Sequence, residues 1–87
     1  MVFVVREIQV TPNPNAMKYV LDRTIASQPA SFFSQQQAKD HSLASRLFAI
    51  GGVTNVMILG DFVTIGKEPK ARWSDINGRV KQILAAE

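Results

Sequence analysis

The sequence predicts an α+β fold: a two-layer sandwich in which a mainly antiparallel sheet of four to five strands carries two helices on one face. Three observations lead to this class. Strand-like runs flank a proline-rich corner, two amphipathic helical stretches follow it, and a short glycine-containing link joins two more apolar runs between those helices. At 87 residues the chain is long enough for one core, so we expect a single domain over residues 1–87.

The first strand is predicted over residues 2–10, because four apolar residues recur there with period two: Val2, Val4, Ile8 and Val10. Phe3 and Val5 make the opposite face apolar as well, and we interpret this end of the strand as covered on both sides. A second strand is predicted over residues 17–22, where alternate positions are large and apolar: Met17, Tyr19 and Leu21. Two strands joined by a tight corner favour an antiparallel pair.

The corner itself, residues 11–18, consists of Thr-Pro-Asn-Pro-Asn-Ala-Met-Lys. Each proline fixes its own φ and keeps the preceding residue out of the helical region, and an asparagine side chain can hydrogen-bond the backbone two residues on. We therefore predict a rigid corner that presents amide side chains. Two interpretations of Asn13 and Asn15 stay open: they satisfy the backbone of the turn, or they bind a partner.

Residues 23–40 form the most polar stretch and show no periodicity. We expect at most a short edge strand over residues 30–35. Adjacent side chains of a strand point to opposite faces, so one of Phe32 and Phe33 should lie on the core and the other should be exposed to a partner.

The first helix is predicted over residues 40–50 from an apolar stripe that includes Leu43, Leu47 and Ile50. Asp40 is the predicted N-cap, and Gly51-Gly52 should end the helix. The second helix is predicted over residues 73–86, with Trp73 on its apolar stripe and Asn77-Gly78 as a weak point in its middle.

Between the helices, strands are predicted over residues 53–59 and 61–67, joined as a hairpin at Gly60-Asp61. Both strands contain nearly continuous apolar runs. This pattern is typical of strands in the middle of a sheet, or of a sheet covered on both faces.

Composition excludes several function classes. With no cysteine, the chain has no disulfide, thiolate metal ligand or thiol nucleophile. The net charge of +3 is mild, and we interpret the cluster of Lys67, Lys70 and Arg72 as a solvated loop, not as a nucleic-acid surface. The apolar start, residues 1–5, is too short to cross a membrane. We expect a cytoplasmic protein that binds neither nucleic acid nor membrane.

Catalytic and metal chemistry have weak support in the sequence. His41 is the only histidine, and at the start of a helix its neighbours Asp40 and Ser42 do not converge with it on one substrate atom. We interpret it as a solvent-facing residue at the helix start. The carboxylates show no metal-ligand spacing, and Trp73 is better explained by core packing than by recognition.

Three blocks of the chain together resemble the N-terminal domain of the Nfu family of iron–sulfur cluster scaffold and carrier proteins, which are related to NifU. Residues 11–18 are similar to the family's TPNPN-x-[LM]-K signature, and residues 43–53, LASRLFAIGGV, are similar to its LA-x-x-LF-x-I-x-GV run. Residues 61–67, DFVTIGK, followed by Trp73, resemble DF-[IV]-TV-x-K…W. The order and the spacing of the blocks agree over almost the whole chain.

The chain departs from the family pattern at three places. It has His41-Ser42 where the family commonly has Ser-Pro, and Gly78 where the family often has proline. Full-length Nfu proteins also carry a CxxC in a separate C-terminal domain, and no such motif occurs in this sequence. Cluster ligation therefore does not transfer, and an iron–sulfur cluster is a cofactor of this chain only by family association.

The resemblance implies a non-catalytic interaction module whose partners are iron–sulfur assembly or client proteins. The candidate contact residues are Asn13, Asn15, Lys18 and Asp61. The alternative is a small ligand-binding protein or enzyme with a site near His41.

Overall fold

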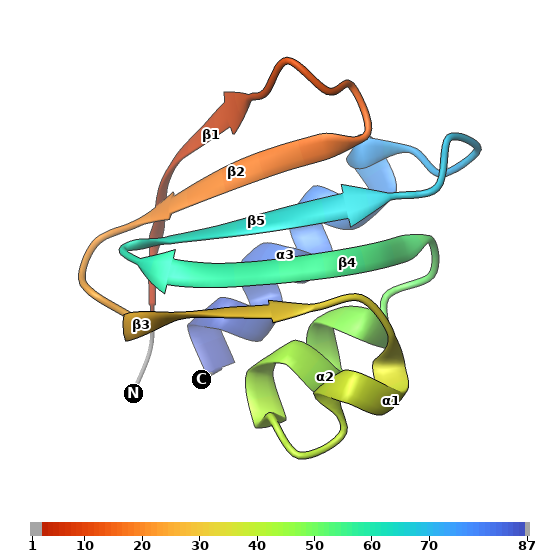
Figure 1. Ribbon diagram of the computed structural model, residues 1–87. Coiled ribbons are helices and arrows are strands. Elements are labelled where there is room, and N and C mark those ends of the chain that lie inside the picture. The colour runs from red at the N-terminus through yellow and green to blue at the C-terminus, as the bar shows by residue number, and fades with distance from the viewer. Residues whose placement is uncertain (1–2, 87) are drawn as a thin grey trace.

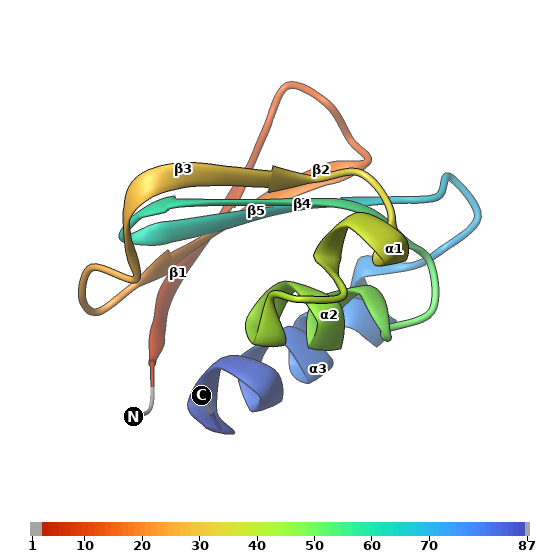
Figure 2. The ribbon, with the colours of Figure 1, turned by 60° about the horizontal axis from the view of Figure 1, so that its bottom comes forward.

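The computed structural model describes residues 3–86, which form two layers (Figures 1 and 2). One layer is a five-stranded sheet in the order β1-β2-β5-β4-β3, and all four pairings in it are antiparallel. Figure 2 shows the helices together on one face of the sheet, and we call the other side the open face. The predicted α+β sandwich is confirmed, but the described residues form three helices instead of two. In chain order the elements are β1 Val5–Val10, β2 Ala16–Leu21, β3 Ala26–Phe32, α1 Gln35–Ala38, α2 Ser42–Phe48, β4 Val53–Gly60, β5 Phe62–Lys67 and α3 Trp73–Ala86.

Strand β1 contains a β-bulge that changes which of its residues face the core. Val5 lies opposite Leu21 and Glu7 lies opposite Val20, so Arg6 is an extra residue without a counterpart. As a result Phe3, Val5 and Ile8 pack against the core. The predicted period-two face of β1 is confirmed at Ile8 and wrong at two positions: Val4, before the bulge, is 56% exposed, and Val10, at the end of the strand, is 82% exposed. The first part of the predicted strand, at Val2, lies outside the described residues.

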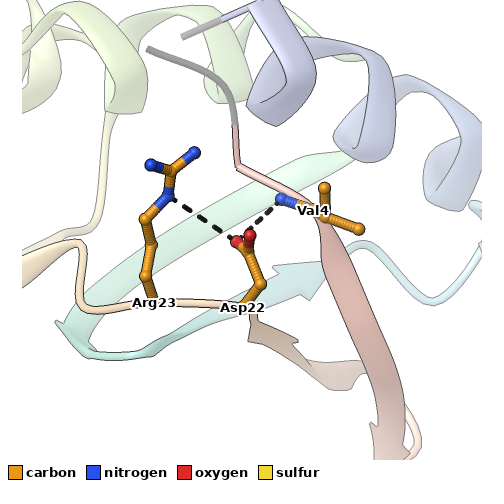
Figure 3. Close-up of polar contacts among 3 residues, drawn as sticks. All are labelled: Val4, Asp22 and Arg23. Atoms are coloured by element: carbon orange, nitrogen blue, oxygen red, sulfur yellow. Dashed lines mark hydrogen bonds and ion pairs between the residues drawn. The ribbon is translucent and has the colours of Figure 1, made fainter.

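Hydrogen bonds and one ion pair join the start of β1 to the residues that follow β2. Figure 3 shows the Asp22 carboxylate between two donors: it accepts a hydrogen bond from the Val4 backbone N–H at 3.1 Å and lies 3.8 Å from Nε of Arg23. The Asp22 backbone N–H donates to the Val4 carbonyl oxygen at 3.0 Å. The Arg23 guanidinium also lies 5.1 Å from the centre of the Phe3 ring. These contacts fix the start of β1 although the bulge interrupts its pairing.

Strands β4 and β5 are interior strands of the sheet, as their apolar runs predicted. The hairpin between them has a two-residue loop, since Leu59 pairs with Phe62, and Gly60 has a φ of 58°. A two-residue hairpin loop needs positive φ at its first position, which glycine adopts without strain. Their covered face consists of Val56 and Ile58 from β4 and Val63 and Ile65 from β5, all at most 1% exposed.

The polar segment 23–40 forms an edge strand and a short helix. Strand β3 begins earlier than predicted and ends at Phe32, and the irregular pairing between Ala26 and Ala30 accommodates Pro29 at the edge of the sheet. Phe32 packs against the core whereas Phe33 is 68% exposed, which confirms the predicted division of the two rings. Helix α1 was not predicted; Ser34 caps it by accepting from the Gln37 N–H at 3.2 Å.

Helix α2 is shorter than predicted, and its N-cap is His41 instead of Asp40. Nδ1 of His41 accepts a hydrogen bond from the Ala44 N–H at 3.1 Å, which is the bond that an N-cap side chain supplies. The His41 ring also lies 5.1 Å from the Phe32 ring, and it is partly buried instead of facing solvent. The change of cap follows from tertiary packing, since Phe32 holds the imidazole at the helix start.

Helix α3 has the predicted bounds and continues through Asn77-Gly78. The Tyr19 hydroxyl, on a side chain with no exposed surface, donates to Oδ1 of Asn77 at 2.6 Å. Asn77 thus satisfies a polar group that β2 buries under the helix. Burial also raises the pKa of Tyr19 above its usual value. None of the helices in residues 3–86 is both long and apolar enough to cross a membrane.

Candidate functional site

The proline-rich corner is closed by hydrogen bonds among its own residues. The Thr11 hydroxyl lies 2.8 Å from the Asn13 carbonyl oxygen and 2.9 Å from that of Ala16. Oδ1 of Asn13 accepts from the Asn15 N–H at 2.9 Å, and the Ala16 N–H donates to the Asn13 carbonyl at 3.0 Å. The corner is therefore ordered by its own sequence, as the two prolines and the Asn-Pro pairs predicted.

Two residues distant in sequence attach the corner to the rest of the fold. The Lys67 ammonium donates to Oδ1 of Asn15 at 3.0 Å, and the Lys67 backbone N–H donates to the Asn15 carbonyl at 2.8 Å. The Trp73 indole N–H donates to the Pro14 carbonyl at 3.0 Å. The last residue of β5 and the first residue of α3 thus both bind the corner, which makes it a fixed part of the domain.

Lys67 is buried, at 9% exposure, so its assignment to a solvated loop was wrong. Besides Asn15, its ammonium contacts the Glu68 carbonyl oxygen at 3.2 Å and lies 5.7 Å from the centre of the Trp73 ring. Neutral oxygens and an aromatic face therefore stabilise the cation. Lys70 and Arg72 are exposed, as predicted. Trp73 packs against the core, as predicted, and the bond to Pro14 is a second role that the sequence did not indicate.

The four candidate contact residues do not form one patch. Asn13 is exposed at the corner, whereas Asn15 is partly buried and its side-chain oxygen holds Lys67. Lys18 alternates with the buried Tyr19 and so lies on the open face. Asp61 is exposed in the β4–β5 hairpin, where its carbonyl oxygen accepts from the Leu21 N–H at 2.7 Å. Strand β2 separates the corner from Asp61 by roughly 17 Å, at about 3.3 Å per residue.

The open face carries an apolar group that sequence analysis did not identify as a surface. Its members alternate with buried residues of β2, β4 and β5, and they are partly exposed and absent from the core cluster: Val20, Met57, Leu59 and Phe62. Lys18 lies across this group, with its ammonium 4.3 Å from the centre of the Phe62 ring. The continuous apolar runs of β4 and β5 were the available signal, but they indicated only the position of these strands in the sheet.

His41 lacks the arrangement that a catalytic base requires. Its Nδ1 lone pair is used by the Ala44 N–H, and its ring packs on Phe32. A hollow of about 320 Å³ lies elsewhere, between the turn that follows α2 and the loop that precedes α3, and its lining includes Gly52, Arg72 and Asp75. The geometry therefore gives no support to a site centred on His41.

The fold and the attached corner define a small two-layer α+β domain in which, among residues 3–86, helices cover one face of the sheet and none covers the other. Within that class, the chain belongs to the family described as "Scaffold protein Nfu/NifU N terminal", which matches residues 5–87. The resemblance of the three sequence blocks is thereby confirmed.

Curated proteins of two staphylococci are similar to most of this chain. The chain is 30% identical over 80 residues to conserved virulence factor C of Staphylococcus aureus (strain MRSA252), a match that covers 92% of this chain and 21% of that protein. The same-named protein of Staphylococcus haemolyticus is also 30% identical over 80 residues, with 92% of this chain and 22% of that protein covered. The chain thus spans about a fifth of the length of these curated relatives.

Solved structures share the fold. A NifU-like protein from Saccharomyces cerevisiae has a TM-score of 0.81 and 25% identity, covering 95% of this chain and 77% of that one. The crystal structure of protein SAV1430 from Staphylococcus aureus has a TM-score of 0.75 over 92% of this chain and 96% of that one. Its 22% identity indicates the fold alone.

Proposed function

We propose that this chain is a non-catalytic interaction module in iron–sulfur cluster assembly or delivery, and that it does not itself ligate a cluster. Membership of the Nfu/NifU scaffold family supports the process. The observation that carries the interaction role is the corner, whose backbone is held by its own hydrogen bonds and by Lys67 and Trp73. A surface ordered before binding loses little conformational entropy when a partner docks.

The proposed contacts are Asn13, which is exposed at the corner, and Lys18, which lies on the open face. Asn13 uses its side-chain oxygen inside the turn, which leaves its amide nitrogen as the group that would donate to a partner. Asn15 acts on the corner through Lys67, so we assign it a positioning role. Asp61, at the far end of β2, would belong to a separate contact.

The proposed partners are cluster-assembly or client proteins, in a cytoplasmic location. The cluster itself would be held by such a partner, because thiolates are the usual ligands of iron–sulfur clusters and this sequence has no cysteine. Nucleic acid and membranes are not among the proposed partners, given the modest net charge of +3.

A pull-down from cell extract with the immobilised protein tests the proposal. We expect cluster-assembly or iron–sulfur client proteins to be recovered, and we expect less of them with the double variant Asn13→Ala/Lys18→Ala. A matched control is Gln36→Ala/Lys39→Ala, which removes one amide and one lysine from exposed positions in and beside α1. The proposal fails if no such protein is recovered, or if the corner variant and its control behave alike.

A further inference from the structure

We propose that the open face of the sheet docks a segment of a partner protein that carries a row of apolar side chains flanked by carboxylates. This inference rests on the proposed function in one respect, that the chain acts through protein contacts. It names a surface and a partner chemistry that the family membership does not supply.

The apolar part of the surface is a continuous row across three strands. Val20 of β2 pairs with Phe62 of β5, which pairs with Leu59 of β4, and Met57 lies two residues along β4 on the same face. These residues alternate with core residues, so they lie on the face opposite the helices, which Figure 2 shows together on one side of the sheet. Directly paired side chains on one face of a sheet touch one another, which explains why Val20, Phe62 and Leu59 are only partly exposed. The row gives an apolar partner segment a surface about three strands wide.

Cations border this row on the side of β1 and β2. The Lys18 ammonium lies over Phe62 at 4.3 Å from the ring centre, where it is in reach of a docked carboxylate. Arg6, the extra residue of the bulge, lines a hollow of about 380 Å³ together with Glu7 and Val20. The bulge therefore brings a second cation to the edge of the apolar row while Val5 and Ile8 stay in the core.

Charge decides between an acidic partner and a second copy of this chain. Beside the row lie the cations Arg6 and Lys18 and two carboxylates, Glu7 and, two residues beyond Val20, Asp22. Both carboxylates already accept hydrogen bonds, Glu7 from Nε2 of Gln9 at 2.8 Å and Asp22 from the Val4 backbone N–H at 3.1 Å. Two copies packed through this face would oppose like charges, and the net charge of +3 adds to their repulsion. An acidic segment would instead approach with complementary charge.

The size of the face suits a short partner segment. Five strands spaced about 4.8 Å apart, with roughly six residues each, give a face of about 19 by 20 Å. A helix about 10–12 Å across fits on it over roughly 20 Å of its length, which is about 13 residues at about 1.5 Å per residue. We therefore expect a single peptide of about this length to contain the whole contact.

The test is a titration of the ¹⁵N-labelled protein with two synthetic amphipathic peptides, followed by NMR. One peptide has leucine on one side and glutamate on the other, and its match has lysine in place of each glutamate. We expect the acidic peptide to shift resonances of the open face, and the basic peptide to have no effect. Raising the salt concentration should weaken the acidic interaction.

Two variants with equal charge change locate the site. Lys18→Glu should weaken acidic-peptide binding by about tenfold, because it replaces an attractive charge by a repulsive one. Lys81→Glu, on the exposed side of α3, should leave binding unchanged. Dispersed spectra of both variants would show that each is folded. Equal binding of the two peptides, equal effects of the two variants, or shifts confined to α2 and α3 would each overturn the proposal.

The outcomes separate this inference from the proposed function. If the acidic peptide binds the open face but the pull-down recovers no cluster-assembly or client protein, the docking surface stands and the proposed process fails. If such proteins are recovered but no peptide shifts the open face, the docking surface alone is refuted. Self-association at increasing concentration, with shifts on the open face, would identify a second copy as the occupant and would also refute it.

Discussion

Replacing Asn77 by alanine should destabilise the protein, although alanine is the better helix former. Asn77 accepts the hydrogen bond of the Tyr19 hydroxyl, at 2.6 Å, on a side chain with no exposed surface. Leaving a buried hydroxyl without a partner costs about 1–3 kcal/mol. Alanine recovers up to about 0.7 kcal/mol through helix propensity. We therefore expect Asn77→Ala to lower the free energy of unfolding by about 1–2 kcal/mol.

Urea unfolding followed by circular dichroism measures this loss for Asn77→Ala, Tyr19→Phe and the double variant. Tyr19→Phe removes the hydroxyl and leaves the partly exposed Asn77 amide within reach of water, so its own cost should be smaller. In the double variant no polar group remains unsatisfied. Its loss should be less than the sum of the two single losses by about 1 kcal/mol.

Two results would refute this reasoning. One is an Asn77→Ala variant as stable as the unchanged protein, which would mean that propensity outweighs the hydrogen bond. The other is strict additivity of the two single variants, which would mean that Tyr19 and Asn77 do not act as a pair.

Three further outcomes follow from single positions, and a fourth follows from the absence of cysteine. Gly78→Ala should stabilise α3 by about 1 kcal/mol, a rise in Tm of about 4–8 °C, because nothing lies within 4 Å of the added Cβ; unchanged thermal unfolding would contradict this. Stability should fall as pH rises above about 10, where tyrosine ionises in the unfolded chain while burial raises the pKa of Tyr19 in the folded one; Tyr19→Phe should remove that part of the slope in urea unfolding measured against pH. Gly52→Ala should lower stability by roughly 2 kcal/mol or more, because its φ is 94° and its Cβ would lie 2.6 Å from that of Ala71; the control Gly51→Ala, with open space around it, should change little in the same assay. The purified protein should stay colourless after reconstitution with iron and sulfide, and a stoichiometric visible absorbance would overturn the proposal that it ligates no cluster.

The sequence correctly predicted those elements whose conformation is determined by a single local signal. Helix α3 has its predicted bounds because the apolar stripe continues in phase across Gly78, and the loss of about 1 kcal/mol at one glycine is too small to end a packed helix. The β4–β5 hairpin was predicted from Gly60 because a positive φ is a local requirement. The corner was predicted from its prolines and asparagines, because the fixed φ of proline and the bond from an asparagine side chain to the nearby backbone are also local properties.

Predictions failed where one local signal concealed another, or where a tertiary contact or a bulge overrode the local pattern. Ser34 followed three residues later by Gln37 is a capping signature, but the polar run around it concealed helix α1. Asp40 is the stronger N-cap by residue type, yet His41 holds that position because its ring packs on Phe32, which the sequence places nine residues earlier. In β1 the alternation was reversed by a single extra residue, Arg6, and period two has no means of indicating a bulge.

The candidate site was only partly predictable. The sequence indicated Asn13 and Lys18, which remain proposed contacts, but it could not show that the Asn15 side chain binds Lys67, from which it is separated by 52 residues. Nor could it distinguish the two sides of an apolar strand. Val56 and Met57 are equally apolar neighbours, and only the position of the helices makes one of them core and the other surface.

The sequence by itself determined the fold class, the family and the rigidity of the corner, because periodicity, proline geometry and a linear motif are properties of neighbouring residues. Tertiary structure decided which surface remains uncovered and what each polar side chain does. Lys67 binds Asn15, and Asn77 accepts the hydrogen bond of Tyr19, only because strands and helices that are distant in the sequence pack together. These roles depend on burial, and burial is a property of the assembled layers, not of the chain.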